Sequence, residues 1–169
     1  MLTKDDLLQS LLAECDIAVH LFGKLPAGAM DYRPSENQRT TRELLQYLGF
    51  CGIGALSAMT DGNWDGYQAW AERLGKRSVD DFVSTMEEQK AALTEAFAQL
   101  TEDDMLRDAT LPVGTVVSLE RALMETALKW LVGYRMQLFL YAKAAGNDEI
   151  WTPDCWVGVS MPRDAAPAE

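Results

Sequence analysis

Three cysteines and one histidine are the residues of this chain that most often act as nucleophiles, bases or metal ligands. Cys15, Cys51 and Cys155 lie far apart and are odd in number, which favours buried, reduced thiols over a disulfide framework or a CxxC pair. On a helix, His20 lies about 140° from Cys15 and about 150° from the apolar stripe. We therefore expect a solvent-facing imidazole and no Cys–His nucleophilic pair.

The stretch DGNWDGYQAWAE, residues 61 to 72, has the spacing of a calcium-binding loop. The residues that would bind the ion or turn the loop are Asp61, Asn63, Asp65, Gly66, Tyr67 and Glu72. Trp64 and Gln68 count against this interpretation, because a small and an aliphatic residue are expected at their positions. Asp, Asn and Gly also form turns after helices, and we favour the turn.

Other catalytic motifs do not occur in the sequence: there is no GxSxG elbow, no HExxH and no P-loop. The glycines of GFCGIG, residues 49 to 54, fall inside a predicted helix and indicate close helix packing rather than a phosphate-binding loop. TEDD at 101 to 104 is typical of a capped helical turn.

Any site must be positioned by four long stretches in which apolar residues recur at helical spacing. The predicted helices span residues 4–25, 41–60, 79–100 and 119–145, with a short helix at 67–73. Helices of this length predict an all-α, up-and-down four-helix bundle over residues 1–150. We expect residues 151–169 to form an irregular tail that packs on the bundle and is disordered at its end.

The last predicted helix is amphipathic, and it places Trp130 and Tyr134 four residues apart on its apolar face. Its opposite face is predicted to hold the charged residues Arg121, Glu125, Lys129, Arg135 and Lys143.

The second predicted helix has no charged residue from 44 to 60. A helix that is apolar on every side must be covered on every side. The residues that point away from its bundle-facing stripe are Phe50, Ile53, Gly54 and Ser57. A further helix or another subunit must pack there, and our hypothesis is a homodimer through this face. The glycines and the capped start of this helix argue against a membrane span.

The composition and net charge of the 169 residues exclude some classes of binding partner. With 48% hydrophobic and 24% charged residues, the chain is in the globular range. Its net charge of −11 repels phosphate backbones and anionic lipids, so we expect neither nucleic acid nor a membrane as partner. The start, MLTKDDLLQS, lacks the pattern of a secretory signal, which makes a cytoplasmic location the expectation.

Two stretches, LPAGAMDYRPSENQRTTRELLQYL and VGYRMQLFLYAKAAG, resemble the DinB-like (DinB/YfiT-like) family. The resemblance implies a small four-helix bundle. It also implies a divalent metal held by three histidines, one early in the second helix and a His-x-x-x-His pair on the fourth, and in some members a thiol-dependent transferase activity.

This sequence departs from the family pattern at all three ligand positions. Tyr47 stands at the position on the second helix, or Gln46 if the alignment slips by one residue, and Trp130 and Tyr134 stand at the two positions on the last helix. A metal site of imidazoles needs several neutral ring nitrogens, and the chain has a single histidine. We therefore expect no metal and no other cofactor.

Aromatic rings at these positions leave two interpretations open. The rings fill a vacated cavity as core, or they form the floor of a small-molecule pocket built from Tyr47, Trp130, Tyr134 and Gln137. Our first hypothesis is a non-catalytic module that binds a small apolar or aromatic molecule or acts as a dimeric interaction module. The alternative is a metal-independent, thiol-dependent transferase in which Tyr47 or Tyr134 is the acid and Arg39 or Arg135 binds an anion.

Overall fold

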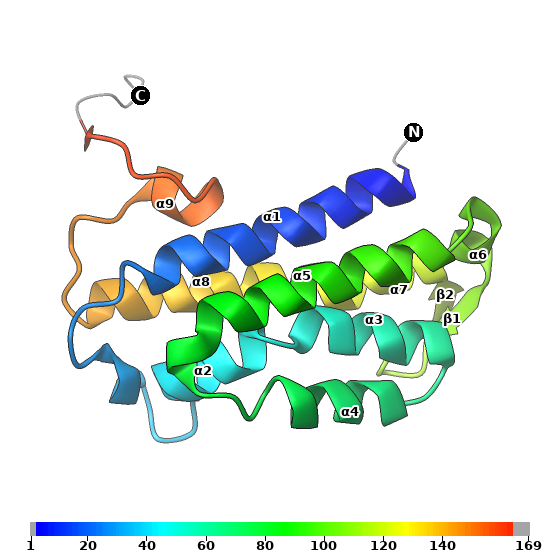
Figure 1. The fold of residues 1–169 in the computed structure, drawn as a ribbon, viewed down its shortest axis with the longest axis horizontal. Coiled ribbons are helices and arrows are strands. Elements are labelled where there is room, and N and C mark those ends of the chain that lie inside the picture. Colours follow the sequence, from blue (N-terminus) through cyan, green and yellow to red (C-terminus); the bar gives the residue numbers. More distant parts are fainter. Residues whose placement is uncertain (1–2, 164–169) are drawn as a thin grey trace.

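Four long helical segments lie side by side in the computed structural model, which describes residues 3–163. They are α1 (Lys4–Phe22), α2 with α3 (Thr41–Leu48 and Cys51–Asp61), α5 (Phe82–Gln99), and α7 with α8 (Leu119–Leu123 and Lys129–Ala144). α1 packs against α5 and α8, and α3 packs against α5 and α7. Figure 1 shows the four segments along the long axis of the molecule. The predicted all-α four-helix bundle is confirmed.

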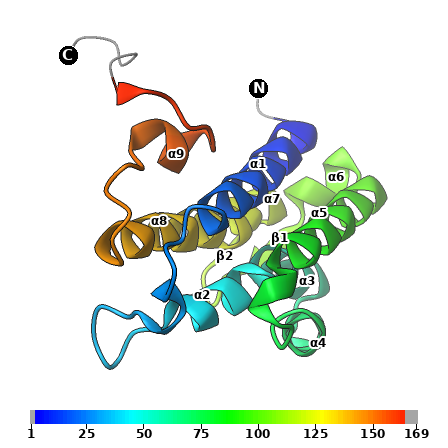
Figure 2. The same ribbon diagram turned by 60° about the vertical axis from the view of Figure 1, so that its left-hand side comes forward.

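Shorter elements connect and cover the bundle. They are the 3-10 turns η1 (Ala29–Asp31) and η2 (Val79–Asp81), the helices α4 (Asp65–Arg73), α6 (Glu102–Leu106) and α9 (Thr152–Trp156), and the strands β1 (Asp108–Thr110) and β2 (Val116–Ser118). The two strands form an antiparallel hairpin in which Ala109 pairs with Val117. α4 runs antiparallel to α3, and α5 therefore points in the same direction as α3 (Figures 1 and 2). The expected up-and-down order, in which successive long helices alternate in direction, did not include this return along α4.

Hydroxyl side chains fix where the helices begin. The hydroxyls of Thr3, Thr40 and Thr101 each accept a hydrogen bond from the backbone amide three residues later. The acidic side chain at that later position in turn accepts a hydrogen bond from the backbone amide of the threonine. Ser118 caps α7 in the simpler way, with its hydroxyl alone. The predicted starts near residues 4, 41 and 119 and the capped turn at 101–104 are therefore confirmed.

The predicted second helix is interrupted, which the sequence pattern did not indicate. α2 ends at Gly49, and α3 restarts after Phe50, whose φ of −139° and ψ of −13° lie outside the helical region. Gln89 of α5 satisfies the groups that this break exposes. Its Nε2 donates to the carbonyl of Leu48 (2.9 Å), and its Oε1 accepts from the amides of Gly52 (3.0 Å) and Ile53 (3.2 Å).

The last helix is also not uniform. A single π turn, Met124–Leu128, separates α7 from α8. At its centre the hydroxyl of Thr126 donates to the carbonyl of Ala122 (2.6 Å), a side-chain bond that competes with the regular backbone ladder. Short π turns inside α-helices occur frequently at functional sites, which directs attention to the residues around this one.

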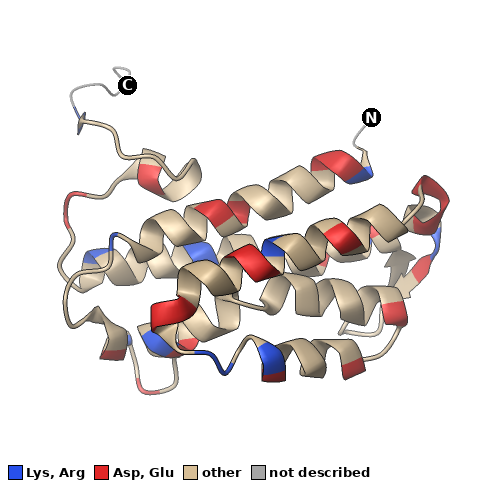
Figure 3. Cartoon of the chain, in the orientation of Figure 1, with Lys and Arg blue, Asp and Glu red and all other residues tan. Residues whose placement is uncertain are grey.

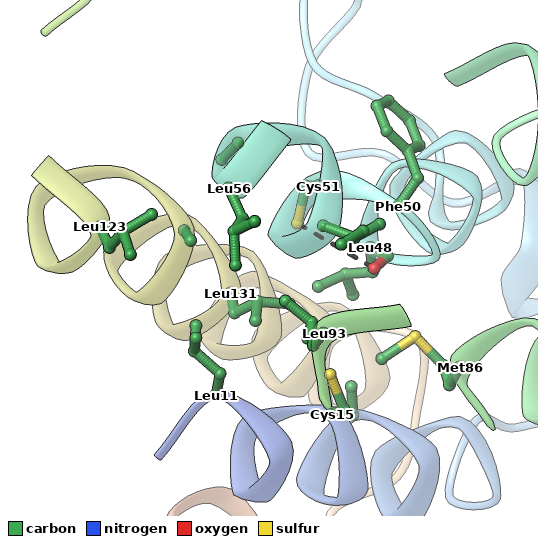
Figure 4. Packing of buried hydrophobic residues seen from close by; sticks show 14 of the residues in the cluster. Leu11, Cys15, Leu48, Phe50, Cys51, Leu56, Met86, Leu93, Leu123 and Leu131 are labelled. Carbon is green, nitrogen blue, oxygen red and sulfur yellow. Dashed lines mark hydrogen bonds between the residues drawn. The ribbon is translucent and has the colours of Figure 1, made fainter. Parts of the chain in front are cut away.

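Leucine side chains from several helices meet in the bundle interior. Figure 4 shows Leu131 of α8 among Leu11 of α1, Leu56 of α3, Leu93 of α5 and Leu123 of α7. The last four are at most 3% exposed, as is Leu131. Cys15 and Cys51 lie in the same core, and Cys155 is buried as well. All three are free thiols, as predicted.

α4 covers the outer face of α3 that was assigned to a homodimer. The ring of Phe50 packs on Tyr67 of α4, and the hydroxyl of Ser57 accepts a hydrogen bond from the indole of Trp70 (3.1 Å). A Cβ added at Gly54 would lie 2.9 Å from the Tyr67 ring. The sequence left open whether a further helix or another subunit packs on this face. In the structure a helix of the same chain, α4, packs there. A dimer through these residues would first have to displace α4.

The segment after α8 folds back onto α1 and α8 instead of running as a wholly irregular tail. α9 packs on α1, as both ribbon views show. His20 contacts Asp154 there, with 2.8 Å between Nε2 and Oδ1. The side chain of His20 is 19% exposed, so the expectation of a solvent-facing ring was wrong. The predicted disorder at the end of the tail concerns residues 164–169, which lie outside the described residues.

Arg135 was also misplaced by the helical pattern. It is 1% exposed, with Nε 2.7 Å from Oε2 of Glu14 and Nη1 donating to the carbonyl of Cys155 (2.7 Å). The guanidinium lies 5.0 Å from the ring centroid of Trp156, which completes the link between α1, α8 and α9. The part of the predicted charged face around Arg135 is therefore covered by the folded-back segment, whereas Arg121 and Lys129 are exposed as expected.

Charged residues gather away from α3. Figure 3 shows that this helix has no charged residue before its last one, Asp61, in agreement with its burial under α4 and the bundle. Within residues 3–163, no helix combines the length and the apolar character needed to cross a membrane.

Candidate functional site

Five aromatic rings form a continuous row between α2, α4 and α8. Tyr47 and Tyr134 are in contact, with 4.6 Å between ring centroids. Tyr47 also packs on Phe50 (5.3 Å), Phe50 packs on Tyr67 (5.3 Å), and Tyr67 meets Trp130 (6.4 Å) edge to face. We call these five residues the aromatic row.

Of the two residues considered for the second helix, Tyr47 belongs to the aromatic row and Gln46 does not. The amide of Gln46 donates to the carbonyl of Arg77 (3.3 Å), on the side of α2 that faces the turn before α5. Tyr47 instead contacts Tyr134 of the last helix. The sequence thus brought Tyr47 and Tyr134 together correctly, whereas Trp130 reaches them only through Tyr67.

Arg39 caps one end of the row. Its guanidinium carbon lies 4.3 Å from the ring centroid of Tyr47 and 5.4 Å from that of Tyr134. The backbone of Arg39 is held by the hydroxyl of Tyr141, which donates to its carbonyl (3.0 Å) and accepts from the amide of Gln137 (2.7 Å). Gln137, a predicted pocket residue, therefore acts on the row only through Tyr141 and Arg39.

Burial makes acid or base chemistry costly inside the row. Burial, together with the hydrogen bond of its hydroxyl to Tyr67, raises the pKa of Tyr47 well above its usual value. Burial also shifts the two core thiols toward the protonated form. It raises the pKa of Cys15 to about 12, and it raises the pKa of Cys51. Because a thiolate is the nucleophilic form of cysteine, these two thiols are poorly suited to attack at neutral pH.

The three residues that the resemblance places at ligand positions do not suit a divalent metal. The indole of Trp130 offers only an N–H donor, and a neutral phenol is a weak ligand compared with imidazole. The raised pKa of Tyr47 works against a phenolate ligand. Elsewhere in residues 3–163, no three His, Cys, Asp or Glu side chains lie close enough together to hold a metal ion.

The calcium-like stretch folds as a turn between two helices. Gly62, with φ of +69°, ends α3 in the left-handed conformation, and the side chain of Asn63 accepts from the amide of Asp65 (2.9 Å). α4 then begins at Asp65, so the last eight residues of the motif are helical and do not wrap around an ion. Glu72 pairs with Lys76 on the surface of α4.

A groove of about 300 Å³ lies beside Trp130, at the other end of the row from Arg39. Its lining consists of Leu111, Pro112, Val113, Glu125, Thr126 and Trp130. The first three belong to the turn of the β1–β2 hairpin, and the others belong to the π turn and the first turn of α8. This volume falls at the lower end of the range of small-molecule sites.

The hairpin turn is bent sharply to reach Trp130. Gly114 has φ of +85°, a conformation that favours glycine, and its amide donates to the carbonyl of Leu111 (2.8 Å). Val113, beside it, is 84% exposed, so the wall of the groove is an apolar side chain presented to solvent.

Sequence reasoning missed most of this groove. It placed Glu125 on a charged face and assigned residues 111–113 to a connector without a role. Neither the apolar spacing nor a motif marks the π turn, and only the hairpin brings residues 111–113 back to Trp130. A valine between a proline and a glycine, at residues 112–114, was the one available signal.

Comparisons with known proteins bear on the fold. No family model matches the chain, and no curated protein matches it in sequence. The structure is similar to the crystal structure of a DinB-like protein, YjoA, from Bacillus subtilis, with a TM-score of 0.66 and 19% sequence identity. The similarity covers 86% of this chain and 96% of that chain. It agrees with the resemblance in the sequence, and we conclude that the chain has a DinB-like fold.

Proposed function

We propose that this chain is a non-catalytic binding module that takes a small apolar or aromatic molecule in the groove beside Trp130. The observation that carries the proposal is the groove itself: an indole and three apolar residues, 111–113, around about 300 Å³, next to a π turn. An aromatic ring offers a ligand a large contact area with few lost rotamers, and a few polar groups then orient it.

The ligand would lie at the end of the row, beside Trp130, and not between Tyr47 and Tyr134. Tyr47 and Tyr134 contact each other and carry Arg39 on their faces, so their surfaces are already occupied by protein. Trp130 is the one predicted pocket residue that also lines the groove. The rest of the row then serves as a rigid support behind Trp130, since close-packed rings have little freedom to move.

The chemistry of the interior supports binding over a transferase reaction. The thiols of Cys15 and Cys51 are buried, with raised pKa values. Arg135, one of the two proposed anion ligands, is bound to Glu14 and to the carbonyl of Cys155. Cys155 lies beside Arg135, with 3.3 Å between Sγ and Nη1, but burial raises the pKa of its thiol as well, and a transferase that used a thiol of this chain would need the thiolate.

A titration of the full, isotope-labelled chain with phenylethanol tests the proposal. We expect the indole N–H signal of Trp130 to shift with saturable dependence on phenylethanol, because the ring packs on the indole face. Val113→Asp should weaken binding at least several-fold, because it puts a charge on the apolar wall. Val83→Asp, an exposed valine in the first turn of α5, is the matched control and should bind like the unaltered chain. A Trp130 signal that ignores phenylethanol at every concentration contradicts the proposal.

A further inference from the structure

The groove beside Trp130 has one charged residue in its lining, and that residue is acidic. Glu125 lies on the π turn, one turn before Trp130 on the same helical segment. The remaining lining residues are apolar or, in Thr126, a buried hydroxyl already bonded to Ala122. A ligand in the groove therefore meets the carboxylate of Glu125 and the indole of Trp130 together.

These two features suit the same kind of chemical group. A carboxylate attracts an ammonium group directly, and the face of an indole is the strongest aromatic partner for a cation. The net charge of −11 adds a long-range field that concentrates cations and repels anions around the molecule. None of these effects favours a neutral molecule over a cation of the same shape.

We infer that the groove selects organic cations, meaning an ammonium group on a small apolar or aromatic body, ahead of neutral and anionic molecules of the same shape. This inference rests on the proposed function, since it concerns the same groove. It adds the charge of the ligand, which the aromatic row by itself does not specify.

Lys129 is the competitor for the carboxylate. It pairs with Glu125 one turn along the helix, and the two side chains are 64% and 36% exposed. A pair of this spacing and exposure is worth only about a factor of two in an equilibrium constant. A bound ammonium that touches both the carboxylate and the indole gains more than this, so it displaces Lys129 from Glu125.

The charge of Glu125 persists when Lys129 leaves. The hydrogen bond from Lys129 lowers the pKa of Glu125, and even an unpartnered glutamate carboxyl titrates far below neutral pH. The carboxylate is therefore negative at pH 7 in both arrangements.

Three probes of one shape test the inference on the full chain at neutral pH: phenylethylamine, phenylethanol and phenylacetate. The readout is the dissociation constant from the shift of the Trp130 indole N–H signal. We expect phenylethylamine to bind about fivefold more tightly than phenylethanol, and phenylacetate to bind most weakly. The preference should shrink as salt is added, because the groove is open to solvent.

Substitutions assign the preference to Glu125. Glu125→Gln should reduce the preference for the amine over the alcohol to the smaller part that the indole of Trp130 and the net charge supply. Lys129→Gln should widen this ratio by about twofold, because it removes the competitor. Glu95→Gln, an exposed carboxylate on α5, is the control and should keep the original ratio.

The outcomes separate the inference from the proposed function. Equal affinity for the three probes at Trp130 overturns the inference and leaves the proposed function standing. A preference for the amine that Glu125→Gln leaves undiminished also overturns the inference. If none of the probes moves the Trp130 signal, the proposed function falls and the inference falls with it.

Discussion

At the scale of single residues, the amide of Gln89 is the most consequential side chain outside the groove. It is 0% exposed and bonds to backbone groups of Leu48, Gly52 and Ile53, which the break between α2 and α3 would otherwise leave unsatisfied. An unpaired buried polar group costs about 1 to 3 kcal/mol. The break places Tyr47 and Phe50 at the angle at which their rings meet, so Gln89 indirectly positions the aromatic row.

Replacing this amide should destabilise the fold. We expect Gln89→Leu to lower the free energy of unfolding by about 3 kcal/mol, because the freed backbone groups find no water in the core. Gln99→Leu, an exposed position at the end of the same helix, should change it by about 0.5 kcal/mol or less. Urea unfolding of both variants measures the free energies of unfolding, and the comparison holds when the m-values of the variants equal that of the unaltered chain. A loss below about 1 kcal/mol for Gln89→Leu would show that the break is satisfied in another way.

The placement of a side chain was predictable where the spacing along its own helix determines it. Tyr47 and Tyr134 were expected to meet, and they do. His20 and Arg135 were not placed correctly, because helical spacing alone assigns a polar residue to solvent. Both are covered by a segment more than 15 residues further along the chain, through Asp154 and Cys155. Nothing in the local pattern shows such a cover.

At the scale of elements, α9 is held to α1 by a small polar network around Asp154. Oδ1 accepts from the hydroxyl of Ser160 (2.9 Å) and lies 2.8 Å from Nε2 of His20, and Oδ2 accepts from the amide of Trp151 (3.1 Å). Burial alone would raise the pKa of Asp154, but these hydrogen bonds outweigh it, and the pKa lies below the usual value.

This direction fixes the pH dependence of the element. A carboxyl whose pKa is lower in the folded than in the unfolded chain stabilises the fold above its unfolded pKa of about 4. The contribution is lost as the pH falls from there through the folded pKa. We expect Asp154→Asn to reduce the free energy of unfolding by about 2 kcal/mol at pH 7 and to flatten its decline below about pH 4.

Unfolding midpoints recorded between neutral and acidic pH check this expectation. Asp148→Asn removes an exposed carboxylate from the same segment and should follow the unaltered chain. If Asp154→Asn loses stability by the same amount at acidic as at neutral pH, the network does not depend on the charge of Asp154.

Element boundaries were predictable where the sequence carries a cap. Thr40, Thr101 and Ser118 mark helix starts because a hydroxyl before an acidic residue satisfies the free amides locally. The break at Gly49 and the π turn at Met124–Leu128 were not predictable from local sequence. The first depends on Gln89, forty residues away from it, and for the second we have no physical cause beyond the hydroxyl of Thr126.

At the scale of the whole molecule, the bundle was predictable because four long amphipathic segments have few ways to bury their apolar faces. The groove was not, because it forms only where the hairpin turn returns to α8. The apolar outer face of α3 was recognised as needing a cover, and α4 supplies it. Homodimerisation stays a prediction, and a dimer through this face would first have to displace α4.

At the three positions where the resemblance to the DinB-like family places histidines, this chain has Tyr47, Trp130 and Tyr134, and we propose that these rings pack without binding a metal ion. Tyr47 and Tyr134 in contact, with Trp130 joined through Tyr67, make one packed row of rings. Such a row can support a binding surface without any ion.

Elemental analysis of the tag-free chain, purified in the presence of zinc, nickel and manganese and then exhaustively dialysed, tests this claim most directly. We expect bound metal far below one ion per chain, because indole and neutral phenol are poor ligands. We also expect chelator to leave the melting temperature unchanged. One tightly held ion per chain, with a melting temperature that falls when the ion is removed, would contradict both expectations.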